Sequence, residues 1–160
     1  MSNSQNKSEN ISTIMVCIDT TNASQAALNY ACHKAKALGF KVHILAVLEA
    51  SHKNLLFGSK AMGNEKRQQL EKHLDKLIDS VRQKTNIIPS VSVREGDIST
   101  EIIREFKLVA GCKLIVFGKS NNSLSDNTVL PQIVSKVGGK INTPITIIPE
   151  SLSDDPVDFI

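Results

Sequence analysis

The sequence has few of the aromatic residues that nucleic-acid-binding proteins use. It contains no tryptophan and one tyrosine, and aromatic residues occupy 4% of its 160 positions. The side chains on which nucleic-acid bases usually stack are therefore missing. The formal net charge of +3 is also modest, so a strong attraction to a phosphate backbone is not expected. We predict no nucleic-acid partner.

Cysteines are also few, and their spacing excludes two kinds of site. Cys17, Cys32 and Cys112 are odd in number and far apart. This arrangement matches neither a disulfide framework nor a CxxC metal or redox pair. We expect three free, buried thiols.

Long hydrophobic runs are absent. The longest purely apolar run, residues 44–48, is far too short to cross a bilayer, and the first ten residues, MSNSQNKSEN, contain no apolar segment. We therefore expect a cytoplasmic protein with no membrane partner. Residues 1–10 are predicted to be a disordered tail, residues 11–149 the folded domain, and residues 150–160, with four acids and no base, an acidic tail.

What the sequence does contain is a regular alternation of two hydrophobic periods. Apolar and β-branched stretches predict strands, and stretches with apolar residues three and four apart predict helices. The predicted strands cover residues 11–19, 41–49, 87–97, 113–118 and 144–149, and the predicted helices cover about 24–38, 70–81, 99–111 and 130–137. The expected fold is α/β, a single domain with a five-stranded parallel open sheet and helices on both faces, of the Rossmann-like type.

Several local signals refine this prediction. Asn22 or Ser24 is expected to cap the first helix, Gly39 to end it, and Ser99 to cap the third. Pro89 places the third strand near a sheet edge. Residues 50–64 lack a clear period and are predicted to form a long loop.

An open parallel sheet binds ligands beyond the carboxyl ends of its strands, at the point where the winding direction reverses. The candidate site is therefore built from the segments after the first, second and fourth strands, which are residues 19–22, 47–50 and 118–132.

Three stretches carry a resemblance to a known family. The strand IMVCID with its small polar turn, the strand LIVFG with its polar loop and helix, and the closing NTPITIIP resemble the universal stress protein family over about residues 11–149. The resemblance implies an adenine nucleotide alpha hydrolase-like fold. In this family the fourth strand is followed by Gly, two residues, Gly, nine residues, and then Gly-Ser or Gly-Thr. Gly118 matches the first glycine, whereas Asn121, Pro131 and Gln132 replace the other three motif residues.

These replacements weaken the phosphate site that the resemblance implies. Backbone N–H groups at a glycine-rich turn and helix start hold phosphate oxygens, but Pro131 has no N–H. The loss of two hydrogen bonds to a charged group, at about 1.5 to 3 kcal/mol each, weakens binding by roughly two or more orders of magnitude. No cofactor is expected apart from ATP, and the replacements argue against tight ATP binding.

The candidate nucleotide-binding residues each have an ordinary alternative role. By resemblance, Asp19 lies beside a ribose or base and Val47 meets an adenine, and Lys119 is placed to neutralise a phosphate. Asp19 is equally suited to a turn, Val47 to the core, and Lys119 to solvent. The complete candidate set is Asp19, Thr20, Val47, Gly118, Lys119, Asn121, Gln132 and Ile133.

No catalytic or metal-binding motif is found. The four histidines lie in different segments, and HExxH, GxSxG, GxGxxG and the Walker motif are absent. Cys32 and His33 are neighbours, but adjacent helical residues point about 100° apart. We predict no catalytic residues and no metal ligands.

Three functional hypotheses follow. The first is a non-enzymatic stress-response protein that acts through unknown protein partners, with a weak or lost nucleotide site. As the family resemblance implies, it would dimerise through the last strand, Ile145 to Ile148. The second is an ATP-binding switch or slow ATPase with an unusual phosphate loop. The third is a small domain like those of electron-transfer flavoproteins, which a yellow colour would reveal.

Overall fold

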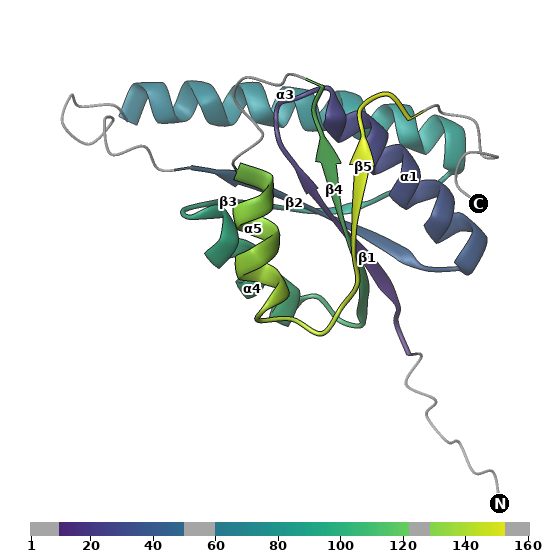
Figure 1. The fold of residues 1–160 in the computed structure, drawn as a ribbon. Coiled ribbons are helices and arrows are strands. Elements are labelled where there is room, and N and C mark those ends of the chain that lie inside the picture. The colour runs from purple at the N-terminus through teal and green to yellow at the C-terminus, as the bar shows by residue number, and fades with distance from the viewer. Residues whose placement is uncertain (1–9, 50–59, 122–128, 153–160) are drawn as a thin grey trace, which may run out of the picture.

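Strands and helices alternate along the chain in the computed structural model, which describes residues 10–49, 60–121 and 129–152. Figure 1 shows the arrangement. The elements in chain order are β1 (Thr13–Ile18), α1 (Ala23–Leu38), β2 (Lys41–Leu48), α3 (Lys60–Thr85), β3 (Ser90–Glu95), α4 (Ile98–Leu108), β4 (Cys112–Lys119), α5 (Val129–Gly138) and β5 (Ile145–Pro149).

The five strands form one parallel sheet in the order β3-β2-β1-β4-β5. β1 is central, and Val16 pairs with Ile44 on one side and Val116 on the other. β3 and β5 are the edge strands, so the edge position predicted from Pro89 is confirmed. The predicted fold class, a parallel open sheet with helices on both faces, is also confirmed.

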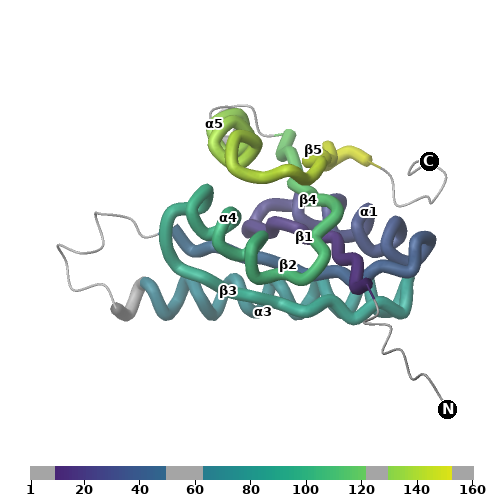
Figure 2. The backbone as a smooth tube through the Cα atoms, turned by 90° about the horizontal axis from the view of Figure 1, so that it is seen from below, coloured from purple at the N-terminus to yellow at the C-terminus, as the bar shows by residue number. Residues whose placement is uncertain are grey.

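The helices lie in two layers, which Figures 1 and 2 show from perpendicular directions. α1 and α3 pack together on one face, and α4 and α5 pack together on the other. The two-residue period of β1 divides its side chains between these layers: Ile14 and Val16 join the core beneath α1 and α3, while Met15 joins the core beneath α4 and α5. Both faces of the central strand are therefore buried, which explains its continuous run of apolar residues.

The structure corrects the predicted cap of α4 and agrees with the predicted cap position of α1. The cap of α4 is Asp97, whose carboxylate accepts a hydrogen bond from the backbone N–H of Thr100 at 2.9 Å. Hydrogen bonds from Thr100 lower the pKa of Asp97. Ser99 is buried inside the first turn and is not the cap. At α1, Asn22 occupies the cap position without a side-chain bond, and Ser24 bonds to the end of β1 instead.

The predicted loop over residues 50–64 is wrong in its last part. α3 begins at Lys60, and residues 50–59 lie outside the described part of the chain. Residues 63–69 of α3 are exposed, so this end of the helix has no buried apolar stripe from which it could be recognised. The predicted tails, residues 1–10 and 150–160, also fall largely outside the described residues. In the described ranges, no helix is long and apolar enough to span a membrane.

Candidate functional site

The winding direction reverses between β1 and β4. These strands are neighbours, but the chain leaves β1 for α1 on one face of the sheet and β4 leads on to α5 on the other. A crevice forms where neighbouring crossovers diverge in this way. It brings together the turns after β1 and β4, which were predicted to form the site.

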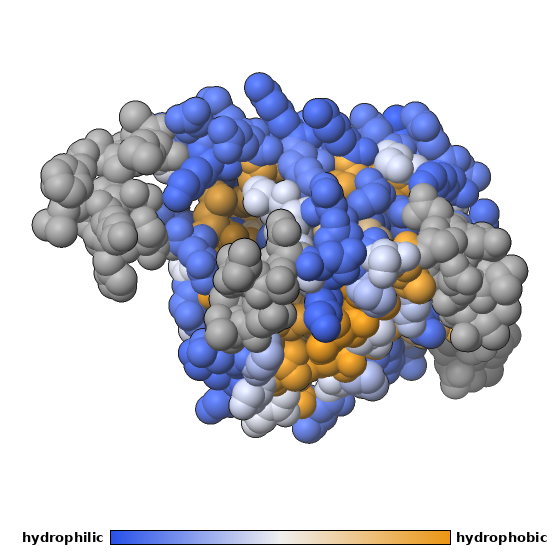
Figure 3. All heavy atoms as spheres, turned by 45° about the horizontal axis from the view of Figure 1, so that its top comes forward, coloured by the Kyte–Doolittle hydropathy of each residue, from blue (hydrophilic) through white to orange (hydrophobic). Residues whose placement is uncertain are grey.

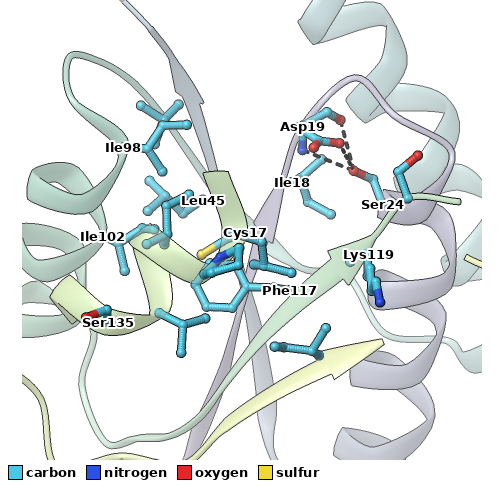
Figure 4. Close-up of a pocket in the computed structure, with 18 residues that line it drawn as sticks. Cys17, Ile18, Asp19, Ser24, Leu45, Ile98, Ile102, Phe117, Lys119 and Ser135 are labelled. Carbon is cyan, nitrogen blue, oxygen red and sulfur yellow. Dashed lines mark hydrogen bonds between the residues drawn. The ribbon is translucent and has the colours of Figure 1, made fainter. Parts of the chain in front are cut away.

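The turn after β1 is organised around Asp19. One oxygen of this carboxylate, Oδ1, accepts hydrogen bonds from the backbone N–H of Thr21 at 2.8 Å, the Thr21 hydroxyl at 2.6 Å and the Ser24 hydroxyl at 2.9 Å. Ser24 is 2% exposed, and its hydroxyl oxygen accepts from the Asp19 N–H at 3.0 Å. Figure 4 shows the two side chains facing each other. Asp19 therefore has the turn role that was one of its two predicted alternatives, and it also borders the pocket described below.

Gly118 lies where β4 passes the start of α1. A Cβ atom at this position would stand 2.5 Å from the carbonyl oxygen and 2.9 Å from the Cβ of Ala23, the first residue of α1. Only glycine allows this close approach of strand and helix. The one residue that matches the glycine motif thus has a packing role that needs no ligand.

A pocket of about 710 Å³ opens between the carboxyl ends of the strands and helices α4 and α5. This volume suits a small-molecule ligand. Most of its lining is apolar, as Figure 4 shows, and apolar residues also reach the surface at this end of the molecule between hydrophilic ones, as Figure 3 shows. The apolar lining comes from the sheet and from helices α4 and α5, and it includes Leu45, Val47, Ile98, Ile102, Phe117 and Ile133.

Five of the eight candidate residues line this pocket: Asp19, Val47, Gly118, Lys119 and Ile133. Val47 also packs against the core beneath α4 and α5, so its two predicted roles are compatible. The other three, Thr20, Asn121 and Gln132, are exposed and do not line the pocket.

The polar end of the pocket lies where β4 ends. Lys119 and Ser120 line it, and Pro131 lies at its border as the third residue of α5. Just outside, the backbone N–H of Asn121 donates to the carboxylate of Glu150 at 2.8 Å. Glu150 directly follows β5 and was not among the candidates, because the pairing of β5 with β4 brings it here from 29 residues away.

The cysteines are free, and their surroundings make them poor nucleophiles. Burial raises the pKa of Cys17, which lines the pocket, and raises the pKa of Cys32 to about 12. Burial also raises the pKa of Cys112. A thiol of high pKa carries little thiolate near pH 7, and the thiolate is the reactive form.

A polar cluster that the sequence analysis missed lies between α4 and the strands β2 and β3. The Glu105 carboxylate, 3% exposed, is 2.8 Å from His43 Nε2 and 2.5 Å from Arg94 Nε. His43 Nδ1 is 2.7 Å from the Ser90 hydroxyl. Burial raises the pKa of Glu105, but hydrogen bonds from Ser92, Arg94 and His43 outweigh it and hold that pKa below its ordinary value.

This cluster joins α4 to the sheet. None of its members lines the pocket, and Arg94 neutralises the carboxylate that His43 contacts. The sequence feature that could have predicted this cluster is the pair of acids Glu101 and Glu105. Their four-residue spacing places both on one side of α4, and both are buried there. Across the described ranges, no group of three or more His, Cys, Asp or Glu residues is arranged to hold a metal ion.

Fold and pocket together define a doubly wound parallel α/β domain with a ligand-sized pocket at its switch point. The chain belongs to the universal stress protein family, whose sequence model matches residues 10–149. No curated protein matches the chain.

Solved structures of the family share the fold. UspA from Lactobacillus plantarum is 17% identical, with a TM-score of 0.71 over 86% of this chain and 97% of that one. The universal stress protein from Archaeoglobus fulgidus in complex with dAMP is 16% identical, with a TM-score of 0.62 over 87% and 98%. A universal stress protein in complex with cAMP is 18% identical, with a TM-score of 0.58 over 88% and 98%.

Proposed function

We propose that this chain is a non-enzymatic, cytoplasmic stress-response protein that acts through protein partners as a dimer and whose nucleotide site is weak or lost. The observation that carries the proposal is the position of Pro131. It is the third residue of α5, within the first turn, where free backbone N–H groups would face an anion. Proline supports the helix start there but has no N–H to offer.

Two further observations support a weak nucleotide site. The N–H of Asn121, at the second glycine position of the motif, already has the Glu150 carboxylate as its partner. Gly118 is explained by its close approach to Ala23, so its presence does not require a phosphate. Among the described residues of the pocket lining, Lys119 is then the one cation.

The edge strand β5 supports the proposed dimer. Within the described ranges no strand pairs with its outer edge, and Ile147 is 43% exposed. An exposed apolar edge strand tends to pair with another chain, and a second copy of the same edge is a natural partner for a two-fold dimer.

A second candidate function is an ATP-binding switch or slow ATPase. It is favoured by the pocket itself, which brings Asp19, Val47, Lys119 and Ile133 together, and by the relatives whose structures contain dAMP and cAMP. The test is to denature the protein as purified and measure released adenine nucleotide by chromatography. We expect far less than one nucleotide per chain, and a stoichiometric amount of ATP would establish the second candidate instead.

A further inference from the structure

The Glu150 side chain is held at the polar end of the pocket by the sheet itself. β5 pairs with β4 so that Pro149 lies opposite Lys119. The next residue, Glu150, continues this pairing, because its backbone N–H donates to the Lys119 carbonyl oxygen at 2.9 Å. The backbone of Glu150 is therefore fixed beside the segment that follows β4.

The carboxylate of Glu150 accepts hydrogen bonds from that segment. Its Oε2 atom is 2.8 Å from the backbone N of Asn121 and 3.4 Å from the hydroxyl of Ser120, a residue that lines the pocket. A backbone N–H that donates to a carboxylate makes one of the stronger kinds of hydrogen bond. This turn therefore already binds an anion, and the anion is part of the chain.

Glu150 opposes a phosphorylated ligand in two separate ways. It occupies the N–H of Asn121, which stands at the second glycine position of the motif, so this donor is already taken by a carboxylate. It also places a negative charge beside Ser120, a residue of the pocket lining, and a charge there repels a ligand phosphate of the same sign. Lys119, the one cation among the lining residues, is exposed and does not bond to this carboxylate in the described structure.

We propose that Glu150 determines the specificity of this pocket by excluding phosphorylated ligands and leaving the pocket to uncharged ligands of nucleoside size. The inference rests on the proposed function, in which the nucleotide site is weak or lost, and it adds to the missing N–H of Pro131 a second cause, the side chain of Glu150. The apolar lining and the volume of about 710 Å³ remain suited to a flat, uncharged ring system.

The test compares ATP with adenosine by isothermal titration calorimetry on the full chain and three variants. Glu150→Gln removes the charge but keeps an oxygen that can accept from Asn121, and Glu150→Ala removes both the charge and the hydrogen bond. Glu65→Gln is the control, because it makes the same chemical change at an exposed position on α3. Thermal unfolding of each variant verifies that the fold is intact.

We expect the unaltered protein and Glu65→Gln to bind adenosine more tightly than ATP. Glu150→Ala should strengthen ATP binding about tenfold or more, which is the worth of one hydrogen bond to a charged group, and Glu150→Gln should have a smaller effect in the same direction. Adenosine affinity should stay within about twofold in all variants, since it lacks the group that Glu150 repels.

An unchanged ratio of ATP to adenosine affinity in both Glu150 variants would overturn the inference. If neither compound binds to any variant, the inference is also overturned. That result would still agree with the proposed function, in which the nucleotide site is lost. Tight ATP binding by the unaltered protein would overturn both the inference and the proposed function.

Discussion

Replacing Gly118 with alanine adds one methyl group where β4 crosses the first residue of α1. The new carbon would lie 2.5 Å from the carbonyl oxygen of Ala23 and 2.7 Å from its carbonyl carbon. Both are backbone atoms, so no side chain can rotate to relieve the contact. The strand cannot move aside easily either, because β4 is hydrogen-bonded to β1 on one side and β5 on the other.

The expected cost follows from this geometry. Overpacking in a well-packed region typically costs about 1–3 kcal/mol, and a clash between two fixed backbones belongs at the upper end. We expect Gly118→Ala to lower the free energy of unfolding by roughly 3 kcal/mol. For a chain of this size, that corresponds to a fall in the melting temperature of about 6–12 °C. Urea unfolding followed by circular dichroism gives both the midpoint and the slope.

Gly63→Ala is the matched control. Gly63 lies in α3, and apart from its own helix backbone and chain neighbours no described atom lies within 4 Å of the added carbon, so alanine should stabilise the helix by about 0.5–1 kcal/mol. If Gly118→Ala unfolds at the same urea concentration as the unaltered protein, the packing explanation of this glycine is wrong. Its presence would then have to be explained by a ligand.

Three other predictions concern the cluster, the edge strand and the thiols. Glu105→Gln should cost about 3 kcal/mol at pH 7, because it removes the charge that pairs with Arg94 and leaves this residue only the more distant carboxylate of Glu101, at 4.0 Å. The pKa of Glu105 is lower in the folded state than in the unfolded state. Its contribution to the free energy of unfolding is therefore present above the unfolded pKa and is lost as the pH falls through the folded pKa. Urea midpoints from pH 7 to pH 3 should therefore converge for the two proteins, and parallel curves would contradict this account. Ile147→Lys should give a monomer by light scattering, whereas the control Val91→Lys, on the opposite edge strand, should stay dimeric. If both variants are dimers, β5 is not the interface. The three thiols should react slowly with Ellman's reagent at pH 8 in the native protein and completely after unfolding, because burial raises their pKa values. A fast reaction of the native protein would contradict the assignment of these thiols as unreactive.

The order and type of the elements were predictable because each depends on a local period. The runs in β1 and β4 are apolar at successive positions, since both faces of these strands are covered, and α1 ends at Gly39, whose φ of 71° is left-handed. The first turns of α3 were missed because residues 63–69 are exposed and carry no apolar stripe. At α4 the cap was placed at Ser99, two residues too late, because both Asp97 and Ser99 are chemically able to cap and only the backbone distinguishes them.

The candidate site was predictable in outline from the strand ends. Asp19, Val47, Gly118 and Lys119 meet at one pocket because the carboxyl ends of parallel strands share one end of the sheet. Asn121 and Gln132 were included by their place in a motif, but both are exposed and do not line the pocket. Motif spacing measures distance along the chain, and the direction of a side chain depends on the turn that carries it.

By itself, the sequence determined the alternation of strands and helices, the crevice at the strand ends and the loss of one N–H donor at Pro131. Each of these follows from properties of single residues or from short periods. Only the tertiary structure decided that Gly118 is required by Ala23, that Glu105 is neutralised between α4 and the sheet, and that Glu150 bonds to Asn121. These contacts join residues that are distant in the chain, and they arise from the order in which five parallel strands pair.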